Sequence, residues 1–211
     1  MLKQVNQDYY NFKNYISKPV WSSYYHQIEE VLNSKKEKIL IIGVGDGIVP
    51  NVLKKEGKRI ITFDFAADLE PDYLGNILEI EKIIKNKFEC ILCCEVLEHL
   101  PFKYFEKIIS KLENLTEKYC IISLPQQNLN IEISIKIPKI PKFQRTISIP
   151  KFYKSFTFEK DGNGEHYWEL NVKNYPVSRI RKILEKYFIL KNEYTVKENP
   201  YHRFFILEKK K

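Results

Sequence analysis

The string CCEVLEHLP carries the residues best suited to chemistry, because Glu95, Glu98 and His99 are spaced at i, i+3 and i+4. On a single helical turn this spacing brings the three side chains to one side. Two carboxylates and an imidazole on one face suit Mg²⁺, Mn²⁺ or another divalent ion. His166, in the string GEHYWEL, is a fourth ligand candidate. We expect Glu98 and His99 to cap the next helix or pack beside a ligand, with a metal site of all four residues as the alternative.

A second chemical feature is the turn GVGDG, residues 43–47, between a predicted strand over 38–43 and a predicted helix over 48–56. Glycines let a ligand approach the backbone, and the helix N-terminus adds bare N–H donors with partial positive charge. Ile48 and Val49 follow the last glycine, where a triphosphate-binding loop would carry Lys and a hydroxyl, so chemistry of that type is excluded. The turn predicts a nucleotide-type site, and a plain strand-to-helix connection is the alternative.

Asp64 follows the next predicted strand, 59–63. In a doubly wound sheet an acid at this strand tip lies beside the glycine turn, where it can accept both hydroxyls of a ribose. Phe65 offers an apolar face to a purine, and Asn76 offers an amide to the exocyclic amine of the base. A solvated acid at position 64 and a simple turn residue at position 76 are the alternatives.

Alternating strands and helices must position these groups. Apolar runs and amphipathic segments alternate along 38–125, and parallel neighbours need such crossover helices. The sequence therefore predicts an α/β fold with a doubly wound, mostly parallel sheet. An amphipathic helix is expected over 177–187, followed by two edge strands over 188–194 and 203–208.

We expect one domain over 1–211, with four parts. They are an N-terminal helical segment (1–37), a cofactor-binding half (38–125), an inserted cap after the fifth strand (126–165), and a C-terminal helix with edge strands (166–211). Isoleucines at alternate positions and several prolines favour a β-rich or irregular cap.

Composition excludes disordered, collagen-like and disulfide-rich classes, since 44% of the residues are hydrophobic and 29% are charged. No apolar run is long enough to span a membrane, and the first residues do not resemble a signal peptide, so we expect a cytoplasmic protein. Cys90, Cys93 and Cys94 lie on a predicted buried strand and are expected to be free thiols rather than zinc ligands.

The net charge of +8 raises the odds of a polyanionic partner or a membrane surface. Cations and aromatic rings interleave in the predicted cap, with no acid between 136 and 158. Such a stretch can grip single-stranded nucleic acid, an anionic lipid or a nucleotide-activated sugar, and a solvated surface loop is the alternative. These residues are Lys136, Lys139, Lys142, Phe143, Arg145, Lys151, Phe152, Tyr153, Lys154, Phe156 and Phe158.

Taken together, segment 38–125 resembles the class I methyltransferases that use S-adenosylmethionine. GVGDG is similar to the first motif of that family, TFDF to the second, LGNI to the third and CCEVLEHLP to the fourth, which is the most specific. The chain departs from the family at Ile41, where an acid is common, and at Asn76, which replaces a common Asp. The resemblance implies a Rossmann-like fold with a seven-stranded sheet.

The resemblance also implies S-adenosyl-L-methionine as the cofactor. The loop backbone at Gly43, Gly45, Asp46 and Gly47 would hold the methionine moiety, and Asp64 would hold the ribose. The adenine would contact Phe65, Asn76 and Ile77. The amino acid end of the cofactor would lie at Cys94 and Glu95, at the tip of the fourth strand. Glu98, His99 and His166 are the candidate catalytic groups, with either histidine as a general base.

The expected acceptor is an O or N nucleophile of a small molecule, a glycan or a lipid intermediate. Two alternatives stay open, namely a metal-assisted RNA 2′-O-methyltransferase and a catalytically silent binding module that keeps the fold. The metal-assisted branch binds its ion with two Glu and two His, and this chain carries one His, not two, in the later segment. No metal cofactor is therefore expected in the main interpretation.

Overall fold

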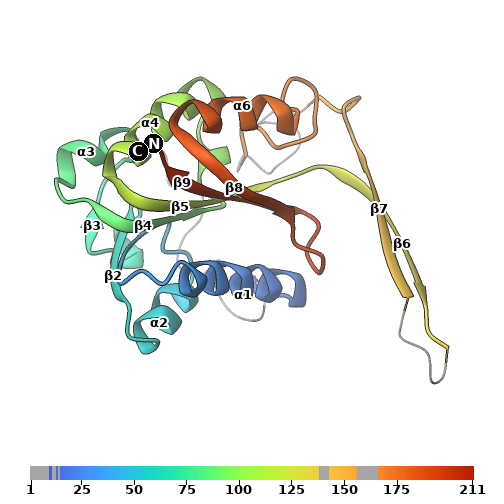
Figure 1. The fold of residues 1–211 in the computed structure, drawn as a ribbon, viewed down its shortest axis with the longest axis horizontal. Coiled ribbons are helices and arrows are strands. Elements are labelled where there is room, and N and C mark those ends of the chain that lie inside the picture. Colours follow the sequence, from blue (N-terminus) through green and yellow to red (C-terminus); the bar gives the residue numbers. More distant parts are fainter. Residues whose placement is uncertain (1–9, 11–12, 14, 138–142, 156–165) are drawn as a thin grey trace.

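The computed structural model describes residues 10, 13, 15–137, 143–155 and 166–211. Over these residues the chain forms a seven-stranded sheet in the order β3-β2-β1-β4-β5-β9-β8 and a separate two-stranded sheet, β6-β7. Helices cover both faces of the large sheet (Figure 1). The predicted α/β fold with a doubly wound, mostly parallel sheet is confirmed.

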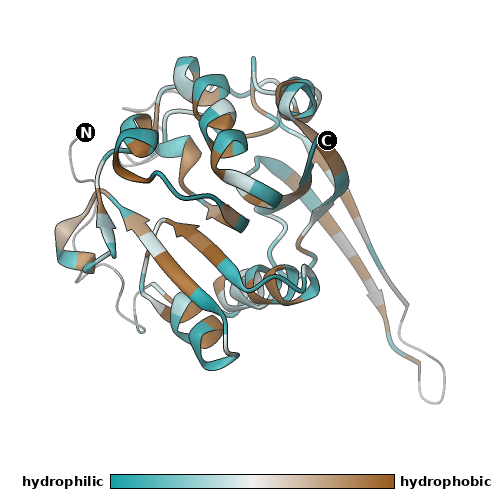
Figure 2. Ribbon diagram, turned by 60° about the vertical axis from the view of Figure 1, so that its left-hand side comes forward, coloured by the Kyte–Doolittle hydropathy of each residue, from teal (hydrophilic) through white to brown (hydrophobic). Residues whose placement is uncertain are grey.

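Parallel strands form the centre of the large sheet. They are β1 (Lys38–Ile42), β2 (Arg59–Asp64), β4 (Phe88–Cys94) and β5 (Thr116–Pro125), and the short β3 (Tyr73–Leu74) continues the sheet beyond β2. Their side chains are mostly buried on both faces because helices pack on each side, and Figure 2 shows the sheet interior as hydrophobic. The carboxyl ends of β1, β2 and β4 consequently meet at one edge.

Two helical layers enclose the sheet. One face carries α1 (Lys18–Asn33) and α2 (Ile48–Lys55), and the other carries α4 (Phe105–Leu115) and α6 (Val177–Tyr187), with the short α3 (Ile80–Ile83) beside α4. A short 3₁₀ turn, η5 (Phe102–Tyr104), precedes α4. None of the described helices combines the length and apolar composition that crossing a membrane requires.

The C-terminal hairpin completes the sheet. Strand β9 (His202–Lys209) pairs antiparallel with β5 on one side and with β8 (Phe188–Thr195) on the other. The two predicted C-terminal strands are therefore present, but only β8 is an edge strand, because β9 lies inside the sheet. The register places His202 opposite Pro125, at the same end of the sheet as the glycine turn.

The insertion after β5 differs from the predicted cap. Strands β6 (Asn128–Ile135) and β7 (Phe143–Pro150) pair as an antiparallel ribbon that projects away from the body as an arm (Figure 1). Its alternate isoleucines face solvent instead of covering the sheet, with Ile131 46% and Ile147 45% exposed. The alternation predicted the strands correctly, but it carries no information on what the apolar face contacts. Lys139, Lys142, Phe156 and Phe158 lie outside the described residues.

None of the four cysteines forms a disulfide. Cys90, Cys93 and Cys120 are buried on β4 and β5, and burial raises the pKa of the Cys90 thiol to about 12. These side chains therefore act as small apolar groups in the core. Cys94 is only partly buried, at the end of β4.

Candidate functional site

The glycine turn after β1 is held by the tip of the neighbouring strand. The Val44 amide donates a hydrogen bond to Asp64 Oδ2 at 2.8 Å, and the Ala66 amide donates to Asp64 Oδ1 at 2.9 Å. Asp64 is only 7% exposed, so these bonds are largely shielded from water. Asp64 thus lies beside the turn, and its contact with a ribose stays a prediction.

Gly43 occupies a position that other residues would strain. Its φ of +89° lies in the left-handed region, which favours glycine. A Cβ atom placed on Gly43 would lie 2.6 Å from Val96 Cγ2, just after β4. The absence of a side chain at Gly43 therefore allows the turn to pack closely against the residue after β4.

Asp46 attaches the turn to two helices. Its Oδ1 accepts a hydrogen bond from the Ile48 amide at 3.0 Å, in the first turn of α2, and its Oδ2 accepts one from the Tyr24 hydroxyl of α1 at 2.7 Å. Burial raises the pKa of Tyr24 well above its usual value, so its hydroxyl remains a donor. The N-terminal helix is thereby fixed against the glycine turn.

A cavity opens at the carboxyl ends of β1, β2 and β4, the edge where open α/β sheets bind ligands. Most of the residues predicted to bind cofactor lie along its wall. They are Gly43, Gly45, Asp46, Asp64, Phe65, Ile77, Cys94 and Glu95. Gly47, the N-cap of α2, and Asn76 are not among the described lining residues.

Asn76 serves the local turn. Its side-chain oxygen accepts a hydrogen bond from the Leu78 amide at 2.9 Å and so caps the 3₁₀ turn η3 (Ile77–Glu79). Its neighbours Gly75 and Ile77 line the cavity instead. The side-chain oxygen of Asn76 is therefore used as the alternative interpretation, a turn residue, expects. The predicted contact of Asn76 with adenine stays a prediction.

The N-terminal segment forms a wall of the cavity that sequence reasoning missed. Tyr10 and Tyr15 line it with ring centroids 5.0 Å apart, and Tyr24 and Gln27 of α1 line it too. The sequence predicts a helical segment over 1–37 but not that this segment borders the ligand cavity. The aromatic run near the start of the chain was the available signal.

Glu95 contacts different residues from those that Glu98 contacts. Its φ of +52° turns the residue toward β5 and β9, where Oε1 accepts a hydrogen bond from the Ser123 hydroxyl at 2.7 Å and Oε2 lies 3.4 Å from His202 Nε2. Burial raises the pKa of Glu95 to about 8 and lowers that of His202 to about 4, so burial favours the neutral form of both. The predicted helical turn over all three residues is replaced by the shorter η4 (Leu97–His99), which excludes Glu95.

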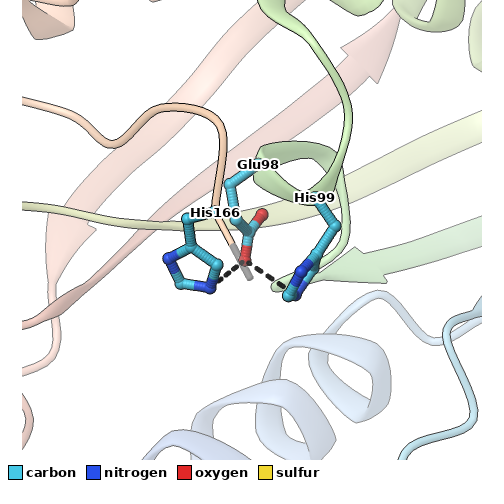
Figure 3. A group of neighbouring side chains, drawn as sticks. All are labelled: Glu98, His99 and His166. Atoms are coloured by element: carbon cyan, nitrogen blue, oxygen red, sulfur yellow. Dashed lines mark ion pairs between the residues drawn. The ribbon is translucent and has the colours of Figure 1, made fainter. Parts of the chain in front are cut away.

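Glu98, His99 and His166 converge, as Figure 3 shows. Glu98 Oε1 lies 3.9 Å from Nε2 of His99 and 3.9 Å from Nε2 of His166, and the two imidazole rings are 4.8 Å apart at 80°. Glu98 is fully buried, whereas the His99 side chain is 26% exposed and lines the cavity. Three of the four residues of the alternative metal site are therefore together, and Glu95 is not among them.

The string GEHYWEL brings His166 to this point by packing against η4. The Tyr167 amide donates to the Glu98 carbonyl at 2.8 Å, and the buried Trp168 donates its indole N–H to the Leu100 carbonyl at 3.0 Å. Contacts of this kind join segments far apart in the chain. They explain how a lone histidine in a late segment reaches the tip of β4.

Glu169 is a further member of the site that sequence reasoning missed. Its Oε1 lies 2.8 Å from His166 Nδ1 and accepts a hydrogen bond from the Tyr201 hydroxyl at 2.6 Å, while Oε2 accepts one from Gln127 Nε2 at 2.7 Å. Burial would raise the pKa of Glu169, but these three bonds hold it below its usual value. The i, i+3 spacing of His166 and Glu169 was the signal that could have indicated the pair.

Neither a family model nor a curated protein sequence matches this chain. Solved structures do. An N-methyltransferase from Bradyrhizobium japonicum in complex with S-adenosyl-L-homocysteine gives a TM-score of 0.64 at 11% sequence identity, over 99% of this chain and 95% of that chain.

Two further structures have the same architecture. Magnesium protoporphyrin IX methyltransferase from Synechocystis, with bound S-adenosylhomocysteine, gives a TM-score of 0.60 at 13% identity, over 97% of this chain and 98% of that chain. A 1,6-didemethyltoxoflavin-N1-methyltransferase from Burkholderia thailandensis gives a TM-score of 0.60 at 10% identity, over 91% of this chain and 81% of that chain. At these identities the likeness establishes the fold, so the chain has the Rossmann-like fold of its methyltransferase neighbours.

Proposed function

We propose that this protein is a class I methyltransferase that uses S-adenosylmethionine. The observation that carries the proposal is the cavity in which Asp64 is hydrogen-bonded to Val44 of the glycine turn, at the carboxyl ends of β1 and β2. The fold supports the same assignment, since three neighbours were crystallised with S-adenosylhomocysteine. A different nucleotide would need other contacts at the turn.

The cofactor is proposed to lie along the strand tips. Each carboxylate oxygen of Asp64 accepts one backbone hydrogen bond and retains a lone pair for a ribose hydroxyl. Phe65 and Ile77 offer apolar contacts to the adenine, and the backbone of Val44 and Gly45 is open to the methionine moiety. The sulfonium methyl group would then point toward the tip of β4 and the Glu98 cluster.

Methyl transfer at this point needs one bond to form and one to break. A lone pair of the acceptor oxygen or nitrogen forms the new bond to carbon while the electrons of the carbon–sulfur bond return to sulfur. The sulfonium becomes the neutral thioether of S-adenosylhomocysteine, and the acceptor's proton leaves to a base or to water. Positioning contributes much of the rate in such a displacement, and we place activation of the nucleophile at Glu98, His99 and His166.

The test of this function is calorimetric titration of the purified protein with S-adenosylhomocysteine. We expect saturable binding with a dissociation constant between about 1 µM and 1 mM, the range usual for substrates of enzymes. NADH is the matched control, because it carries the same adenosine but not the thioether amino acid, and it should bind much more weakly. Absence of heat at millimolar S-adenosylhomocysteine would overturn the proposal.

Among the expected acceptors, which are a small molecule, a glycan and a lipid intermediate, we propose the lipid intermediate. The arm carries an apolar face formed by residues between 44% and 51% exposed, and Arg145 lies opposite Ile133 on this same face. The apolar residues are Leu129, Ile131, Ile133, Ile135, Ile147 and Ile149. An apolar face that also carries a cation suits the surface of an anionic membrane. A second copy of the arm would add like charges instead of neutralising them.

The arm also starts at the right place. It follows Pro125 at the end of β5, and its base is tied to the site because Gln127 donates to Glu169. An acceptor anchored in a membrane under the arm would therefore be presented at the same edge of the sheet as the cavity.

We expect the double variant Ile131→Ser with Ile147→Ser to bind anionic phospholipid vesicles about 10- to 100-fold more weakly than wild type. The two side chains are a cross-strand pair, and each loses roughly 1 kcal/mol of burial in the lipid. Ile189→Ser, on β8 with 46% exposure, is the matched control and should leave binding unchanged. Co-sedimentation with anionic and with zwitterionic vesicles measures the effect.

Wild type should favour the anionic vesicles and lose that preference as salt is raised. Equal binding of the double variant and wild type would contradict the lipid surface. If wild type instead binds a single-stranded RNA and not the vesicles, with affinity that falls steeply with salt, the RNA alternative replaces the lipid acceptor.

A further inference from the structure

Glu98, His99 and His166 direct three ligand atoms toward one point beside the cavity. Their candidate ligand atoms all lie within 4.8 Å of one another, and both histidine Nε2 atoms are 3.9 Å from Glu98 Oε1. These separations are too long for hydrogen bonds. Ligand atoms bound at about 2.0–2.2 Å from one ion stand roughly 3–4 Å apart, which is the spacing found between Glu98 and each histidine.

Among the described residues, no hydrogen-bond partner compensates the burial of the Glu98 carboxylate. Glu98 is 0% exposed, and neither of its oxygens has a hydrogen-bond partner among the described residues. Leaving a buried charge unpaired costs several kcal/mol. Burial, with the nearby Glu95, raises the pKa of Glu98 well above its usual value. A cation between the three side chains would stabilise the ionised form and remove that cost.

The surroundings of His166 point the same way. Its Nδ1 is hydrogen-bonded to Glu169, an arrangement that in the neutral ring leaves the Nε2 lone pair directed at Glu98. Histidines that bind metal ions almost always donate their other ring N–H to a carboxylate or carbonyl in this way. Glu169 is in turn fixed by Tyr201 and Gln127, so His166 is held in a single orientation.

We propose that Glu98, His99 and His166 form a binding site for a divalent transition ion of the Zn²⁺ type. Two imidazoles and one carboxylate favour Zn²⁺, Co²⁺ or Fe²⁺ over Mg²⁺, which prefers oxygen ligands and water. Three protein ligands are the number that leaves a coordination position open, as in catalytic sites rather than structural ones. His99 lines the cavity, so the open position would face the bound ligand.

This inference deepens the proposed function and rests on it for its chemical role. An acceptor hydroxyl bound to the ion would have a lowered pKa and would lose its proton to water near neutral pH. The ion would then supply the nucleophile, and His99 would be a ligand rather than a general base. Glu95, at the same strand tip, keeps its hydrogen bond from Ser123 and its 3.4 Å approach to His202.

Titration of chelator-treated protein with Co²⁺ and Zn²⁺ tests the site directly. We expect wild type to bind about one equivalent of Co²⁺ with visible absorption bands and to release it to Zn²⁺. Glu98→Gln, which preserves shape and removes charge, should weaken Zn²⁺ binding by about 100-fold, and Glu169→Gln by roughly 10- to 100-fold. His26→Ala, on α1 and outside both the cluster and the cavity wall, is the matched histidine control and should bind as wild type does.

Thermal unfolding with and without Zn²⁺ separates binding from folding. Wild type should gain stability with the ion, whereas Glu98→Gln should melt no lower than wild type in chelator and gain nothing from Zn²⁺. Metal binding by Glu98→Gln equal to that of wild type, or no binding by wild type, overturns the site. S-adenosylhomocysteine titration in excess chelator keeps the two claims apart, because the Asp64 cavity does not need the ion.

Discussion

Replacing Gly43 with alanine should reduce the free energy of unfolding by about 2–5 kcal/mol and weaken S-adenosylhomocysteine binding roughly 5- to 150-fold. The positive φ costs about 1–2 kcal/mol for a residue with a Cβ, and the 2.6 Å approach to Val96 adds about 1–3 kcal/mol of overpacking. If the free loop moves to relieve that contact, ligand binding must restore it and loses the same free energy. Chemical denaturation and calorimetry measure the two effects.

Gly57→Ala is the matched control for backbone strain. Gly57 has a φ of +79°, close to that of Gly43, but nothing lies within 4 Å of a Cβ placed there. It should lose only about 1–2 kcal/mol of stability and keep its affinity for the ligand. Equal losses of affinity in the two variants would show that the contact between the glycine turn and Val96 has no part in forming the cavity.

The sequence predicted the fold well because its strongest signals are local. Apolar runs such as KILII and FECILCC, each stopped by a turn, define strands buried on both faces, and the amphipathic period of 177–187 matches α6 to the residue. Proline and glycine mark the helix starts at α1 and α2. Parallel pairing then follows from the alternation itself.

The site was only partly predictable because it depends on contacts between distant segments. One residue in a left-handed conformation, Glu95, directs its side chain to Ser123 and His202 instead of to the two histidines beside Glu98. His166 reaches Glu98 only because Trp168 and Tyr167 pack on η4, and Glu169 gains its role from Tyr201 and Gln127. No periodicity encodes such pairings.

The arm shows a different limit. Alternation along 131–137 indicates a strand with one apolar face, whether that face covers the sheet or is exposed. In the structure it is exposed, so the residues expected to enclose the acceptor pocket instead form a surface. Local pattern determines which side chains share a face, and tertiary contacts determine what the face meets.

Asp64→Asn should raise the dissociation constant for S-adenosylhomocysteine by about 100- to 1,000-fold. The substitution keeps the shape but removes the charge and one of the two acceptor oxygens, so the ribose loses charge-assisted hydrogen bonds of about 1.5–3 kcal/mol each. The NH₂ group of the new side chain would also point at the N–H of Val44 or of Ala66, so that two donors meet. This mismatch should reduce the free energy of unfolding by about 1–3 kcal/mol. Titration calorimetry and thermal unfolding give the two quantities.

Asp72→Asn distinguishes recognition from stability. Asp72 accepts hydrogen bonds from the amide and the hydroxyl of Thr62, both at 2.8 Å. Thr62 is on β2, as Asp64 is, but Asp72 does not line the cavity. Each variant therefore changes a carboxylate that accepts two hydrogen bonds, and of these two carboxylates only Asp64 lies in the cavity wall. Loss of affinity confined to Asp64→Asn assigns the ribose contact to that carboxylate. Affinity that falls equally in both variants would mean that a distorted strand, and not a missing ribose partner, accounts for the loss, and the cofactor assignment would lose its anchor.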